Sequence, residues 1–451
     1  MSTHKYIDQI CVAVLAVTLI ITILFMNGEA LGIEKIVDWD SENYSGSVYF
    51  TANDEKTDLY GSSATVIALK GSEASVSGPG AYAYDGGVVI KNAGIYTVSG
   101  TLTDGSIVVD AGASAKVFIL LKNVDVTSMS SAAFLVRRAD KVFLTLADGS
   151  ENVFTTLETG AGEAQSVETD GAVFSHDDLT INGSGSLTVT AGLLHGISVN
   201  DDLVITGGTI RVTAPADGIR ANDSIRIKNA DITVTAGDDG LIANAEGAYL
   251  YVLSGNLTID AAADAVQASG AVTVDGGSFS VRSGDDGIHS DTAITVNGGE
   301  ITVINDSLSD ADGLDSNGNI SVTGGSIRIS LPGSGANTAI DCDGSLQISG
   351  GDIIACGSFT TARGFDAGSA QPSILCTVKD GADAGSVFSV ADADGNVLIS
   401  WELPLRCSSV NVSCPGLSVG ETCTVTCGGE TCTVTLEETA NSIFFNNDTA
   451  I

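Results

Sequence analysis

The chain has 451 residues and carries 56 carboxylates against 19 lysines and arginines, a formal net charge of −37. This charge argues against a nucleic acid as partner, because phosphate backbones are bound by basic surfaces. Glycine accounts for 54 residues and proline for 6, and 43% of residues are apolar, which excludes a disordered tail and a collagen-like chain. The length exceeds one ordinary globular domain, so several domains or one extended repeat architecture are expected.

The N-terminus carries the only segment of the sequence that is typical of a membrane. Ile10–Met26 is an uncharged run of 17 residues, which as a helix would span about 25 Å. Lys5 precedes the run and acidic residues follow it, so we expect the N-terminus inside the cell and the bulk of the chain outside. The expected location is therefore the outer face of the cell membrane, or the medium if the chain is cleaved after Ala30.

From about residue 173 one unit recurs along the chain. It consists of an Asp-Gly-apolar turn, a short strand, a polar turn, a second strand, Gly-Gly and a third strand. The apolar residues after the Asp-Gly-type turns follow one another at intervals of 22 to 26 residues: Ile197, Ile219, Leu241, Val266, Ile288, Leu314 and Ile340. One such unit cannot bury its own apolar face, so the units must stack.

Strict alternation within the unit sets the strand type. In Ser224–Ile227 and Ile232–Thr235, apolar and polar residues alternate, whereas a helix would need apolar residues three and four apart. We predict an all-β, right-handed parallel β-helix with three short strands and 22–26 residues per coil, β caps and one N-terminal membrane helix. A propeller or an antiparallel sandwich fits less well, since a propeller blade needs about 40–50 residues.

This architecture divides the chain into five predicted parts. They are an anchor or signal segment in 1–30, a linker in 31–60, an N-terminal β region with the opening coils in 61–165, the regular β-helix in 166–360 and a cysteine-containing C-terminal β cap in 361–451.

A carboxylate precedes most of the repeated apolar residues, so stacking should place these groups about 4.8 Å apart. Two such charges repel by about 1 kcal/mol even in water. Calcium relieves this repulsion, because it takes about six to eight oxygen ligands from carboxylates and turn carbonyls. The predicted calcium ligands are Asp217, Asp238, Asp239, Asp264, Asp285, Asp286, Asp312 and Asp315. The alternative is that Asp-Gly is only turn chemistry, with each aspartate bonded to its own backbone.

Few residues are typical of catalysis. The histidines are dispersed, no Gly-x-Ser-x-Gly motif occurs, and His195 and His289 are predicted to lie at the surface. Five arginines at outward strand positions are predicted to be solvated or ion-paired: Arg211, Arg220, Arg226, Arg282 and Arg328. We predict no enzyme, with a polysaccharide lyase that uses calcium and an arginine base as the runner-up.

Aromatic and cysteine side chains add weaker signals. The candidates for contact with sugar are Tyr82, Tyr84, Tyr249, Tyr251, Arg220 and Trp401, and each aromatic residue fits core or edge packing equally well. Cys427 and Cys432 flank a predicted hairpin loop, where a disulfide or two buried thiols are equally consistent. No pair has CxxC spacing, so zinc is not expected.

Three segments and the Asp-Gly-Ile coils resemble a known family, the carbohydrate-binding-domain-containing β-helix proteins of Gram-positive (clostridial) cell surfaces. The segments are AGIYTVSGTLTDGSIVVDA (93–111), ADKVFLTLADGSENVF (139–154) and SHDDLTINGSGSLTV (175–189). The resemblance covers about residues 61–436. It implies a fold similar to that of pectate lyases, bound calcium, and binding of cellulose and pectic polysaccharide without lyase activity.

Residues and resemblance together predict a non-catalytic, cell-surface protein that binds plant cell-wall polysaccharide with the help of Ca²⁺. A chain with a net charge of −37 repels polygalacturonate, so such binding should depend on calcium bridges and be lost on chelation. A passive surface rod without a glycan ligand is the second alternative, after the lyase.

Overall fold

The computed structural model describes residues 49–58, 60–61, 64–157, 170–308 and 311–445. Met1–Ala52 and Asn53–Ile451 are two separate compact units. The membrane helix predicted within residues 1–30 lies outside the described residues. In the part of the chain that is described, no helix has the length and apolarity needed to cross a membrane.

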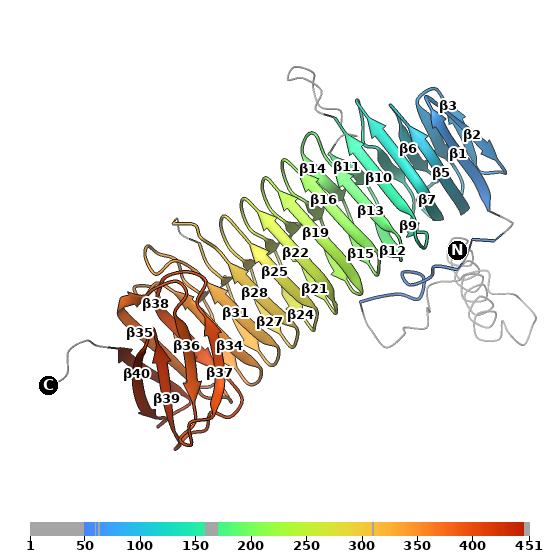
Figure 1. Ribbon diagram of the computed structural model, residues 1–451. Coiled ribbons are helices and arrows are strands. Elements are labelled where there is room, and N and C mark those ends of the chain that lie inside the picture. Colours follow the sequence, from blue (N-terminus) through green and yellow to red (C-terminus); the bar gives the residue numbers. More distant parts are fainter. Residues whose placement is uncertain (1–48, 59, 62–63, 158–169, 309–310, 446–451) are drawn as a thin grey trace, which may run out of the picture. The chain divides into compact units, whose positions relative to one another are not determined.

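The described part of Asn53–Ile451 is an all-β, right-handed solenoid of about ten turns (Figure 1). Each coil contributes up to three strands, which pair in parallel with the equivalent strands of the next coil. One side of the solenoid is a twelve-stranded sheet. Its strands are β3 (Ala81–Tyr84), β4 (Gly87–Ile90), β6 (Ser106–Asp110), β8 (Phe134–Arg138), β11 (Gly171–Ser175), β14 (His195–Val199), β17 (Ile219–Ala221), β20 (Leu241–Ala243), β23 (Val266–Ala268), β26 (Ile288–Ser290), β29 (Leu314–Ser316) and β32 (Ile340–Cys342).

The other two sides are two rows of strands joined through the long strand β7. The β15 row consists of β1 (Thr65–Gly71), β5 (Gly94–Leu102), β7 (Lys116–Ser128), β9 (Lys141–Leu146), β12 (Asp178–Gly183), β15 (Asp202–Ile205), β18 (Ser224–Ile227), β21 (Tyr249–Val252), β24 (Val272–Val274), β27 (Ala293–Val296), β30 (Asn319–Val322) and β33 (Leu346–Ile348). The β16 row consists of β10 (Glu151–Thr156), β13 (Ser186–Thr190), β16 (Thr209–Ala214), β19 (Ala230–Ala236), β22 (Gly255–Ala261), β25 (Ser278–Arg282), β28 (Glu300–Ile304), β31 (Ser326–Ser330) and β34 (Asp352–Gly357).

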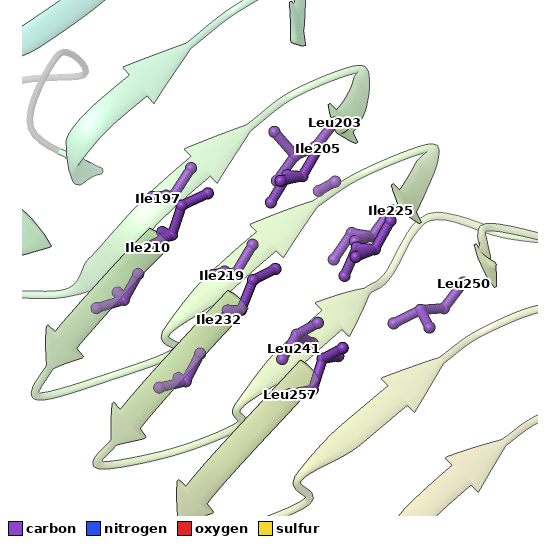
Figure 2. Packing of buried hydrophobic residues seen from close by; sticks show 14 of the residues in the cluster. Ile197, Leu203, Ile205, Ile210, Ile219, Ile225, Ile232, Leu241, Leu250 and Leu257 are labelled. Carbon is purple, nitrogen blue, oxygen red and sulfur yellow. The ribbon is translucent and has the colours of Figure 1, made fainter. Parts of the chain in front are cut away.

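The apolar residues of successive coils lie above one another. Ile197 pairs with Ile219 and Ile219 with Leu241, and the series continues without a break to Ile340. Figure 2 shows this column beside a second one of the β16 row. All seven residues of the first column are buried, and each large apolar side chain contributes about 1.5–3 kcal/mol on burial. The register predicted from the 22 to 26 residue spacing is confirmed.

Two glycine positions of the repeat have separate physical causes. At the Asp-Gly turn, a Cβ on Gly218 would lie 2.2 Å from Cγ1 of Val234, and one on Gly240 would lie 2.4 Å from Cγ2 of Ile259. These glycines therefore make room for β-branched side chains across the core of the coil. The second residue of Gly-Gly, as in Gly299 with φ of 93° and Gly325 with φ of 88°, has a left-handed backbone that favours glycine.

Antiparallel strands cover both ends of the stack. At the first coils, β2 (Glu73–Ser77) pairs with β1. At the last coil, β34 pairs with the antiparallel strand β38 (Cys407–Ser413), which ends the parallel stacking of the β16 row and covers its edge. The other strands of this cap are β35 (Ser373–Ala382), β36 (Val387–Ala391), β37 (Val397–Glu402), β39 (Thr422–Cys427), β40 (Glu430–Thr435) and β41 (Ala440–Phe445).

The cysteines of the described chain lie mainly in this C-terminal cap and its junction with the solenoid. All eight are free thiols, Cys427 and Cys432 among them, and seven of the eight are buried. Burial raises the pKa values of the Cys356 and Cys376 thiols well above their ordinary range. The structure thus uses these residues as small apolar side chains.

Candidate metal site on the twelve-stranded sheet

A column of carboxylates runs along the turns that precede the strands of the twelve-stranded sheet. Oδ1 of Asp217 accepts a hydrogen bond from the backbone N–H of Asp239 at 3.3 Å, and Oδ1 of Asp239 accepts one from Asp264 at 3.0 Å. The series continues through Asp286 and Asp312 to the N–H of Thr338. Each bond crosses to the next coil instead of closing the aspartate's own turn. One oxygen of each carboxylate thus joins two coils, and the second is left for another partner.

Three groups of side chains along this column bring potential metal ligands together. In each group the ligand atoms lie within 4.8 Å of one another. The first group is Asp217, Asp238 and Asp239, the second is Asp264, Asp286 and His289, and the third is Asp312, Asp315 and Asp341. Two oxygens on opposite sides of one calcium ion are about 4.8 Å apart, because each Ca–O distance is about 2.4 Å. The spacing within each group therefore fits a single bridging ion.

Three aspartates of the column are unfavourable as anions, first because they are buried and second because they lie near one another. Burial, together with the charges of neighbouring carboxylates, raises the pKa of Asp239 to about 6, that of Asp264 to about 7 and that of Asp312 to about 8. Asp264 is only 7% exposed. Because a shift of one unit corresponds to about 1.4 kcal/mol, the ionised column is unfavourable unless positive charge is supplied.

Two histidines lie along this column, and the prediction that both are surface residues was wrong for His195. His195 is 9% exposed, is the first residue of β14 and lies one coil before Asp217 in the same register. Its Nδ1 faces the backbone N–H of Asp217 at 3.2 Å and the carboxylate of the same residue at 3.1 Å. Burial acts to raise the pKa of Asp217, but the hydrogen bond and charge of His195 hold it below its ordinary value. A polar partner in the next coil offsets the cost of burying the His195 ring.

His289 lies among three carboxylates. Its Nδ1 is 2.7 Å from Asp315 and 3.3 Å from Asp286, and its Nε2 is 3.3 Å from Asp291. Hydrogen bonds to Asp286 and Asp315 raise the pKa of His289 to about 11. The imidazolium therefore acts as a built-in cation between the second and third groups.

The structure thus unites most of the predicted ligands and adds two that the sequence reasoning missed. Asp341 pairs in register with Asp315, so the same 26-residue spacing could have identified it. His289 follows Ile288, and its position in register with Asp315 was the available signal. Asp285 is in none of the three groups, although its charge contributes to the raised pKa of Asp239.

The predicted sugar-binding aromatics do not form one platform. Tyr82 and Tyr84 are 49% and 40% exposed on β3 in the first coils, whereas Trp401 packs against the core of the C-terminal cap. Tyr251 is 4% exposed, so it is a packed residue, and its hydroxyl donates to Asp275 at 2.5 Å. Its neighbour on the same strand, Tyr249, is half-buried.

Outward arginines of the solenoid pair with acidic residues. Arg220 lies 3.6 Å from Asp217 and Arg226 lies 2.6 Å from Asp202. Arg282 and Arg328 pair with Asp306 and Asp352. The prediction of solvated or ion-paired positions is confirmed for these four, and Arg211 is exposed.

Fold and site together define the class: a β-solenoid with a carboxylate column along one sheet. Residues 84–360 match the sequence profile of a family described as "Carbohydrate-binding domain-containing protein", and the chain belongs to this family. A relative of the same description from Acetivibrio thermocellus is 42% identical over 128 residues. The match includes 28% of this chain and 45% of the relative, so it spans about half of the relative's length. A solved structure, described as a polysaccharide lyase-like protein from C. thermocellum in a gadolinium derivative, is 27% identical and aligns with 66% of this chain and 100% of its own at a TM-score of 0.46.

Proposed function

We propose that the protein binds polysaccharide outside the cell, without catalysis, and that calcium held by the acidic column assists binding. The observation that carries this proposal is the set of three groups whose ligand atoms lie within 4.8 Å of one another along one sheet. Family membership supports the carbohydrate as ligand. An anchor in residues 1–30 would keep the solenoid at the cell surface.

The donor atoms fit calcium to different degrees. The first and third groups consist of carboxylate oxygens alone, the ligand type that calcium prefers. In the second group, the His289 ring competes with an ion for Asp286. In the first group, Asp217 already faces His195 and Arg220. In the third group His289 faces Asp315 at 2.7 Å, but Asp312 and Asp341 are left for an ion, and burial makes Asp312 unfavourable as a free anion. The third group therefore suits calcium best.

The ligand's chemistry follows from the charge of the protein. Three carboxylates do not fill the about six to eight oxygen positions of calcium. Carboxylates and hydroxyls of an acidic polysaccharide such as polygalacturonate would complete the shell. The net charge of −37 repels that polymer in the absence of the ion, so calcium would act as the bridge.

The test is retention of the protein on immobilised polygalacturonate, in calcium and in EDTA. We expect retention in calcium, release by EDTA and poor replacement by magnesium, which demands a stricter octahedral geometry. Retention that is unaffected by EDTA would contradict calcium assistance, and no retention in calcium would favour the passive rod. The appearance of unsaturated uronate absorbance in the same mixture would identify a lyase instead.

A further inference from the structure

A polar groove lies between the β15 row and the segment that precedes the first strand. This segment, here called the strap, comprises Asn53–Asp58 and Tyr60. The groove has a volume of about 710 Å³, which is within the range of about 300–1,000 Å³ that is typical of ligand sites. It belongs to none of the three acidic groups of the twelve-stranded sheet.

The floor of the groove is a column of residues on, or directly after, five successive strands. Leu120 pairs with Thr145 and Thr145 with Asn182. Thr206 and Lys228 follow the last paired residues of β15 and β18 and continue the column. The strands involved are β7, β9, β12, β15 and β18, and β7 to β15 follow one another along the stack in Figure 1. Four steps of about 4.8 Å give a column about 19 Å long, and the strap lies along it through contacts to Thr145, Asn182, Thr206 and Lys228.

Buried polar contacts hold the strap in place. The carboxylate of Asp54 is fully buried, lies 2.9 Å from Nζ of Lys141 and accepts a hydrogen bond from Thr180 at 2.6 Å. The backbone carbonyl of Asp54 accepts from Asn182 at 3.0 Å and from Thr206 at 2.5 Å. The wall of the groove is therefore fixed across several coils, and a preformed wall reduces the entropy lost on binding.

The far end of the strap closes against the same floor. The Tyr60 hydroxyl shares a hydrogen bond with Thr145 at 2.6 Å, and Glu55 forms an ion pair with Lys228. Burial raises the pKa of Tyr60 to about 12, so the hydroxyl stays protonated.

The exposed groups that line the groove can form hydrogen bonds with the hydroxyls of a sugar. Lys122 and Asn229 bring donors, and Asp58 and Asp148 bring acceptors, beside the apolar side chain of Leu120. Three acidic and two basic residues line the groove, so its formal charge is −1 within a chain of −37. A sugar hydroxyl donates and accepts at once, as serine does, and therefore pairs with both kinds of group.

One atom of the floor adds to this picture. The side-chain oxygen of Asn182 is buried and has no hydrogen-bond partner within the described part of the chain. Buried acceptors are seldom left without a donor. A hydroxyl of a bound ligand, or a water that accompanies it, could satisfy this oxygen.

We propose that the groove binds a neutral, hydroxyl-rich oligosaccharide without calcium, as a second glycan site beside the acidic column. This inference rests on the proposed function, glycan binding, and adds a metal-independent ligand class and a location. A nearly uncharged groove attracts a polyuronate less than a neutral glycan, because the surrounding surface is strongly acidic.

The test is calorimetric titration of the full chain, in EDTA, with neutral hexasaccharides of β-1,4-linked glucose, xylose and mannose. At least one of these ligands should bind. The substitution Ser184→Trp places a large side chain at the exposed rim of the groove and should reduce binding at least tenfold. The matched control Ser280→Trp, at an exposed position of the β16 row, should leave it unchanged. Asp148→Ala, also exposed, removes one acceptor and should weaken binding even if Ser184→Trp does not fold.

The outcomes separate the two proposals. No binding by any of the three hexasaccharides, or equal binding by wild type, Ser184→Trp and Asp148→Ala, would overturn the groove as a site and leave the calcium-dependent retention untouched. Binding that Ser184→Trp abolishes, in a protein whose polygalacturonate retention ignores EDTA, would support the groove and contradict the calcium proposal.

Discussion

Replacing Asp312 and Asp315 together by asparagine is expected to weaken calcium-dependent binding of polygalacturonate at least tenfold, or by about 1.4 kcal/mol. The third group then loses two of its three charges, whereas asparagine at 312 keeps an oxygen that accepts from the N–H of Thr338. The coil should therefore still fold, and the lost affinity would report the missing ion. The measurement is a binding titration of the folded variant in calcium.

The control for this variant is the double substitution Asp231→Asn and Asp260→Asn. Both residues are exposed on the β16 row, and the change in net charge is the same. Unchanged affinity of the control is expected. If both variants lose affinity equally, the effect comes from overall charge, and the third group is not the site.

The second prediction with a large expected effect is the pH dependence of the free energy of unfolding in the absence of divalent cations. The pKa values of Asp264 and Asp312 are raised to about 7 and about 8 in the folded protein, whereas an unfolded aspartate titrates near 3.9. Between about pH 4 and pH 8 the folded state therefore holds more protons than the unfolded state, and the free energy of unfolding falls as pH rises. His289, with a pKa raised to about 11, changes stability in the same direction above about pH 6.5.

In EDTA we thus expect the melting temperature to decrease steadily from pH 4.5 to pH 8, and added calcium to remove most of this decrease at pH 8. Asp264→Asn should be more stable than the wild type in EDTA at pH 8, because the amide keeps the oxygen that accepts from Asp286 and carries no charge. Differential scanning calorimetry measures both effects. A melting temperature that rises with pH in EDTA would show that the column is not strained by its charges.

The sequence was sufficient to predict the features that recur in every coil. Side chains such as Ile219 and Leu241 must stack because one unit cannot bury its own apolar face, and a constant spacing then fixes which residues pair. The same logic located the aspartates of the column and would have located Asp341. The hydrogen bonds from each aspartate to the next coil did not follow, because spacing alone does not reveal the direction of a side chain in a turn.

Contacts that occur once were beyond this reasoning. The burial of His195 depends on contacts with both neighbouring coils, since its Nδ1 faces Asp217 in the next coil and its backbone N–H donates to the carbonyl of Asp170 in the preceding one. The strap packs through Asp54 against Lys141 and Thr180, which are 87 and 126 positions away in the chain. A local sequence pattern therefore cannot predict this packing. The three acidic groups combine repeated and unrepeated residues. The repeat places their aspartates, whereas His289 occurs once and brings a histidine into a group that the repeat alone would make purely acidic.

The most direct test is anomalous diffraction from crystals of the protein grown with calcium and, separately, with EDTA. The calcium crystals should show an anomalous peak between Asp312, Asp315 and Asp341, within about 2.3–2.6 Å of at least one oxygen from each, and the peak should be absent in EDTA. Crystals in calcium with no peak beside any of the three acidic groups would contradict the account.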